Sequence, residues 1–92
     1  MELITTKRVA EKLKAYLRHE LDLSALVDWA EQAMLDAEFE PTHHDEIRDV
    51  VSRLGLANVK SFALTWDDIE RFLAQLGYEA RVEVVANYRL CL

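Results

Sequence analysis

The sequence has little of the residues that break or cross-link a chain: two glycines, one proline and one cysteine among 92 residues. A single cysteine excludes an internal disulfide, so no covalent framework holds the fold. So few glycines and prolines argue against long irregular loops. Together with the 51% of apolar residues they predict a compact globular chain. A chain of this length forms one small domain, residues 1–92, around a single modest core.

Long apolar runs are also missing, since no stretch approaches the roughly 20 residues that a membrane-spanning helix needs. The first residues, MELITTKRVAEK, lack the apolar segment of a secretory signal. Basic residues number 11 against 17 acidic ones, for a net charge of −6. Nucleic-acid affinity comes mainly from basic groups. The sequence therefore predicts a cytoplasmic protein that binds neither nucleic acid nor a membrane.

Patterns typical of catalysis are absent as well. Both glycines follow helical patterns, so neither belongs to a glycine-rich phosphate loop. Ser24, Ser52 and Ser61 lie outside a G-x-S-x-G motif. Cys91 is the second residue from the end, where a nucleophile is hard to preorganise beside a base. We therefore expect no enzymatic activity, no catalytic residue and no cofactor.

What the sequence does contain is apolar residues at helical spacing, in four stretches. The stretches cover residues 7–19, 24–39, 42–54 and 65–76. The predicted core positions are Val9, Leu13, Tyr16, Leu17, Leu26, Ala30, Ala33, Ala37, Ile47, Val50, Val51, Leu54, Ile69, Phe72, Leu73 and Leu76. The predicted N-caps are Thr5 or Thr6, Ser24, Thr42 and Thr65.

The last two stretches also carry signals for both of their ends. Thr42 is followed by Asp45 and Thr65 by Asp68, and this spacing predicts a capping box in each helix. A glycine follows each stripe, at positions 55 and 77, and predicts a left-handed residue after the helix.

The end of the chain changes to a strand-like pattern. Val82 and Val84 alternate with Arg81 and Glu83, and β-branched residues are frequent. The backbone N–H and C=O groups of such a strand need a hydrogen-bonding partner. The candidates are residues 2–5, residues 59–64 and the same strand of a second subunit. The last choice makes a homodimer through residues 79–92. Residues 58–64 themselves fit either a strand or a helical turn. The predicted fold is mainly α (α+β), with four amphipathic helices in a small bundle and a short C-terminal β-strand.

Charge is unevenly distributed along the chain. Residues 1–19 carry five basic and two acidic groups, whereas residues 20–49 carry ten acidic groups and only Arg48. This middle third attracts a basic partner if one exists. The sequence therefore predicts a small protein-interaction module that binds a basic protein partner through residues 20–49. Short acidic bacterial proteins that neutralise a basic nuclease have this profile.

Five residues of the second helix are the candidate partner-binding residues: Asp28, Trp29, Glu31, Leu35 and Asp36. Leu35 projects among the acids, where it is an apolar anchor, an ordinary exposed leucine or a residue covered by the C-terminal segment. Trp29 lies at the boundary between the buried and the acidic sides. Trp66 flanks the stripe of the fourth helix and is expected in the core.

The stretch EFEPTHHDEIR, residues 38–48, offers a second kind of site. His43, His44 and Glu46 are weak candidate metal ligands, because they lack the i, i+4 spacing of helical zinc sites. A metal-binding or metal-regulated protein is therefore the alternative function, although we expect these histidines to belong to a helix start. A third alternative is a structural protein that self-assembles through its C-terminal strand.

Overall fold

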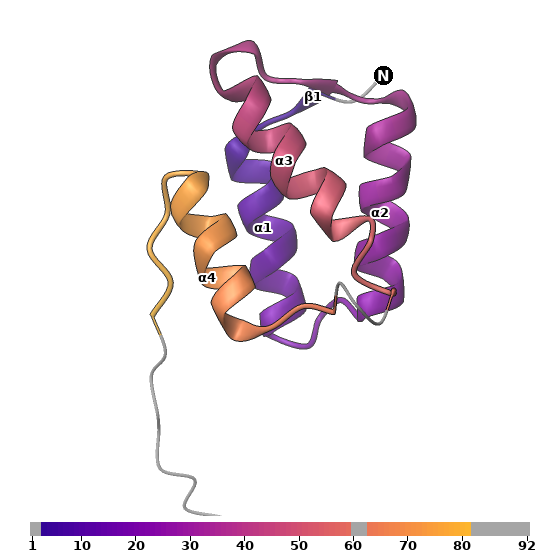
Figure 1. The fold of residues 1–92 in the computed structure, drawn as a ribbon, viewed down its shortest axis with the longest axis vertical. Coiled ribbons are helices and arrows are strands. Elements are labelled where there is room, and N and C mark those ends of the chain that lie inside the picture. Colours follow the sequence, from indigo (N-terminus) through magenta and orange to yellow (C-terminus); the bar gives the residue numbers. More distant parts are fainter. Residues whose placement is uncertain (1–2, 60–62, 82–92) are drawn as a thin grey trace, which may run out of the picture.

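The computed structural model describes residues 3–59 and 63–81. This part of the chain is mainly helical, as the sequence predicts (Figure 1). Its α-helices are α1 (Thr6–Leu17), α2 (Leu23–Asp36), α3 (His44–Leu54) and α4 (Trp66–Gln75), and a 3₁₀ turn, η1 (Pro41–His43), precedes α3. Two short strands, β1 (Leu3–Ile4) and β2 (Glu38–Phe39), form a parallel sheet.

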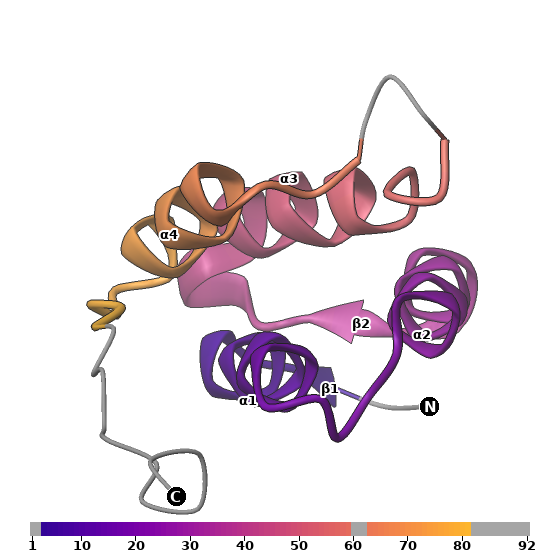
Figure 2. The same ribbon diagram turned by 90° about the horizontal axis from the view of Figure 1, so that it is seen from below.

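The helices form two layers, with α1 and α2 in one layer and α3 and α4 in the other (Figure 2). The helical stripes read from the sequence face inward between these layers. Leu13, Leu26, Ile47, Val50 and Leu54 are each fully buried, and most other stripe residues are buried beside them. Thirteen of the sixteen predicted core positions are thus buried, and Tyr16, Leu17 and Ala37 are half-buried against the same core.

The sheet differs from the sequence prediction. The strands described lie at residues 3–4 and 38–39, not at the C-terminal end. Residues 79–81, the described start of the predicted C-terminal segment, are neither strand nor helix, and residues 82–92 lie outside the described part. Ile4 is opposite Phe39, and the Glu40 N–H donates to the Ile4 carbonyl at 2.9 Å. Residues 24–39 are accordingly not one helix. Ala37 is extended and β2 follows it, because this segment pairs with β1 rather than closing another helical turn.

Two of the predicted N-caps are wrong. Asp22, not Ser24, caps α2, because its carboxylate accepts a hydrogen bond from the Ala25 N–H at 2.8 Å. Thr42 lies inside the 3₁₀ turn that begins at Pro41, so it cannot cap α3, and Asp45 has no capping box there. Because that turn carries the chain directly into α3, the helix begins without a side-chain cap.

The other predicted caps are confirmed at Thr5 and at Thr65 with Asp68, where both hydrogen bonds of the capping box are present. Gly77 is left-handed, with φ of +93°, as predicted. Gly55 is not, because its φ of −63° continues the right-handed turn into the following residues.

Two smaller expectations concern Trp66 and residues 58–64. Trp66 is not a core residue, since 39% of its surface is exposed. Residues 58–59 and 63–64 are neither helix nor strand, and the residues between them lie outside the described part.

Candidate functional site

The exposed side of α2 is the most distinctive surface of the described part. Asp28, Glu31 and Leu35 lie at i, i+3 and i+7, so they follow one line along the helix, with Asp36 beside it. All four side chains are exposed, and Leu35, at 76%, is the most exposed of the large apolar residues described. We call these four residues the acidic face of α2.

The acids of this face are not neutralised by the neighbouring helix. Within residues 3–59 and 63–81, no ion pair includes Asp28, Glu31 or Asp36. The basic residues of α1 therefore do not cancel the negative charge of α2 by direct contact. Salt at 0.1 M screens exposed charges from one another mainly beyond about 10 Å. Within that distance the unpaired acids give the acidic face a negative potential.

Trp29 lies at the edge of α2 that faces α1. It is half-buried, and the Lys12 ammonium lies 5.6 Å from the centre of its ring, within the range of a cation–π contact. The sequence prediction that Trp29 lies between the buried and acidic sides is thus confirmed by its position.

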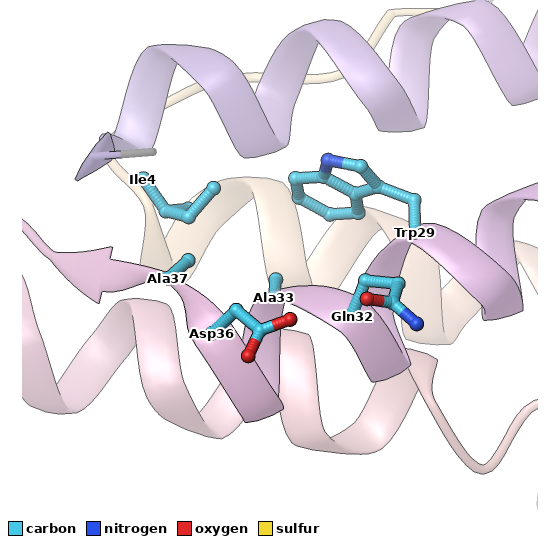
Figure 3. A pocket seen from close by; sticks show the side chains of 6 residues that line it. All are labelled: Ile4, Trp29, Gln32, Ala33, Asp36 and Ala37. Atoms are coloured by element: carbon cyan, nitrogen blue, oxygen red, sulfur yellow. The ribbon is translucent and has the colours of Figure 1, made fainter. Parts of the chain in front are cut away.

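A small pocket of about 150 Å³ opens beside this tryptophan (Figure 3). It brings together Trp29 and Asp36, two of the candidate residues, with others that the sequence did not indicate. The lining residues are Ile4, Trp29, Gln32, Ala33, Asp36 and Ala37. Helical spacing places Gln32 between Trp29 and Asp36, so that residue was within reach of prediction. Ile4 could not be predicted as a lining residue, because only the pairing of β1 with β2 brings it to the pocket.

The histidine cluster has a different geometry. His43 and His44 are exposed and Glu46 is half-buried. The His44 ring stacks edge-on against Phe39, with centroids 5.6 Å apart, and its Nδ1 lies 3.5 Å from the Asp45 carboxylate. Among the described residues, no group of three or more His, Cys, Asp or Glu side chains is placed to hold a metal ion.

A larger groove of about 460 Å³ runs between α1 and α4. Lys7, Lys14 and Arg81 contribute positive charge to its walls, and Trp66 and Tyr78 contribute aromatic surface. Its walls also carry two acids, Glu11 and Glu79, and Glu79 lies 3.5 Å from Arg81. The sequence does not predict this groove, because its pattern places Trp66 in the core. With three basic and two acidic side chains, the groove lacks the excess of negative charge that a basic partner needs.

None of the helices described is both long enough and apolar enough to cross a membrane. The chain matches no protein-family model, no curated protein and no solved structure.

Proposed function

We propose that this protein is a protein-interaction module whose acidic face of α2 binds a basic partner protein. The observation that carries the proposal is the position of Leu35, 76% exposed in the line of Asp28 and Glu31. An apolar side chain surrounded by unpaired acids supplies both parts of a binding site. The leucine gives buried area, and the acids give orientation and a fast encounter.

The charges of the molecule support a basic partner over an acidic or neutral one. The net charge is −6, and the ten acidic groups of residues 20–49 include every acid of this face. No ion pair within the described residues competes for the carboxylates of Asp28, Glu31 and Asp36. A partner with Lys or Arg around an apolar patch would therefore meet charges that are already free to pair.

The test is capture from a lysate of the organism that encodes the protein, at low salt, followed by elution with a salt gradient. We expect one basic protein to leave at moderate salt. Its affinity, measured afterwards with purified components, should fall about tenfold for Leu35→Ala, as for an interface anchor. The combined variant Asp28→Asn/Glu31→Gln/Asp36→Asn should bind more weakly and with a flatter salt dependence.

Matched controls exist elsewhere on the molecule. Leu56 is another exposed leucine, at 45%, and lies in the turn after α3, so Leu56→Ala should leave the affinity unchanged. Glu70→Gln removes an exposed acid from α4. Circular dichroism should show that every variant folds, since surface substitutions cost about 0.5 kcal/mol or less. Equal affinity for the wild type and the variants of the acidic face would remove the proposal.

A further inference from the structure

The pocket beside Trp29 combines an apolar interior with a polar opening (Figure 3). Ile4 is 1% exposed and Ala33 is 4% exposed, so they form its floor. The Trp29 indole forms one wall. Asp36 and Gln32 are exposed and lie one helical turn apart on α2, so a carboxylate and an amide stand at the rim.

The size of the pocket limits what can occupy it. Pockets that hold drug-sized ligands measure about 300–1,000 Å³, and this one is about 150 Å³. Its volume therefore suits a single protein side chain rather than a separate small molecule. Such an occupant needs an apolar stem for the floor and a positively charged end for Asp36 at the rim.

We infer that this pocket receives an arginine side chain of the basic partner. Arginine has a three-carbon stem that can lie on Ile4 and Ala33, and its planar guanidinium can stack on the Trp29 indole. The same guanidinium can pair with both oxygens of the Asp36 carboxylate, while lysine offers only a point charge. The inference rests on the proposed function and names the side chain that the acidic face recognises.

Lys12 opposes the binding of a cation at this site. Its ammonium lies 5.6 Å from the Trp29 ring, although Lys12 does not line the pocket. Removing this like charge should favour a bound guanidinium. Lys12→Gln is therefore expected to strengthen arginine binding, the opposite direction to any substitution that merely damages the site.

The experiment uses the full-length ¹⁵N-labelled protein and N-acetyl-arginine amide as the probe, followed by NMR. The indole N–H of Trp29 and the side-chain amide of Gln32 should shift, with a millimolar dissociation constant. Trp66, on α4, is an internal reference whose indole signal should stay in place. N-acetyl-citrulline amide, which has nearly the same shape without the charge, should bind about two- to fivefold more weakly, as for an exposed ion pair.

Two matched variants separate the pocket from the general negative charge. Asp36→Asn should reduce arginine binding to the level of citrulline, whereas Asp28→Asn, on the same helix but outside the pocket, should not. Three results would overturn the inference: absence of binding, equal binding of arginine and citrulline, or equal effects of Asp36→Asn and Asp28→Asn. Preferential binding of N-acetyl-norleucine amide would overturn it too, because the occupant would then be an apolar side chain.

Failure of this inference and failure of the proposed function give different results. A partner that depends on Leu35 but is indifferent to Asp36→Asn would retain the interaction module and remove the arginine pocket. A partner indifferent to both substitutions would remove both. The probe titration needs no partner at all, so it tests the pocket independently of the capture experiment.

Discussion

The Asp68 carboxylate contacts both the N-cap residue of its own helix and a basic residue of α3. Its carboxylate accepts a hydrogen bond from the Thr65 N–H at 3.2 Å, and its own N–H donates to the Thr65 hydroxyl at 3.2 Å. Arg53, on α3, lies 3.6 Å from the same carboxylate, and Arg71 pairs with its other oxygen. One side chain thus caps α4 and joins it to α3.

These contacts hold the pKa of Asp68 below its usual value. The largest cause is the hydrogen bond from the Thr65 backbone, which favours the ionised carboxylate; desolvation opposes it, and the Thr65 side chain, Arg71 and Arg53 reinforce it. A carboxyl whose folded pKa is lowered stabilises the fold above its unfolded pKa, near 4. That contribution is lost as the pH falls from this value through the lower, folded pKa.

We therefore expect Asp68→Asn to lower the melting temperature at pH 7 and to flatten its decline between about pH 5 and pH 2. Thermal unfolding followed by circular dichroism across this range measures both effects. Asp67→Asn is the matched control, because Asp67 is exposed and lies one residue earlier in the same helical turn. A wild type and an Asp68→Asn variant with parallel pH profiles would show that this carboxylate does not link folding to pH.

At the scale of single elements, the start of α2 distinguishes two possible caps. Asp22 accepts a hydrogen bond from the Ala25 N–H at 2.8 Å, whereas Ser24 lies within the first helical turn. Asp22→Ala should therefore cost about 1 kcal/mol of unfolding free energy, the typical value of an N-cap. Ser24→Ala should be close to neutral or slightly stabilising, because alanine is the better helix former.

Urea unfolding of both variants measures this difference directly. The pair is a matched test, since the substituted residues are two positions apart at one helix end. A larger loss for Ser24→Ala than for Asp22→Ala would place the start of the helix two residues later than the structure does.

The elements themselves divide into those that local signals determine and those that need the whole fold. Helical stripes and the Thr65–Asp68 capping box were predictable, because periodicity and cap spacing are properties of a few neighbouring residues. The conformation of Gly55 was not, since glycine also fits the right-handed turn found there. The pairing of β1 with β2 joins residues about 35 positions apart. A strand of two residues has no local sequence pattern that predicts such a pairing.

The candidate site divides in the same way. The exposure of Asp28, Glu31, Leu35 and Asp36 was predictable, because a helical wheel places them without knowledge of the neighbouring elements. Their role in binding stays a prediction. The pocket was not, since Ile4 reaches it only through the two-stranded sheet. The exposure of Trp66 depends on how α4 lies against α1, which periodicity within one helix cannot give.

At the scale of the whole molecule, charge is separated between two neighbouring helices. α1 carries four basic residues and one acid, whereas the acidic face of α2 lies on the adjacent helix of the same layer. A basic protein approaching in solution is therefore drawn to one side of the molecule and repelled from another. Such a field changes the rate of encounter and the orientation of the partner more than it changes the final affinity.

This separation predicts that the charges and the leucine of the acidic face act on different rate constants. With the partner of the proposed interaction, Asp28→Asn/Glu31→Gln should lower the association rate several-fold at low salt. The loss should disappear at high salt, where the charges are screened. Leu35→Ala should leave the association rate nearly unchanged and raise the dissociation rate, because its apolar contact forms only after docking. Stopped-flow association and dissociation measured at two salt concentrations separate these effects.

If the acid variants slowed association equally at both salt concentrations, they would act by contact rather than by steering. If Leu35→Ala changed only the association rate, the leucine would not be the anchor of this face.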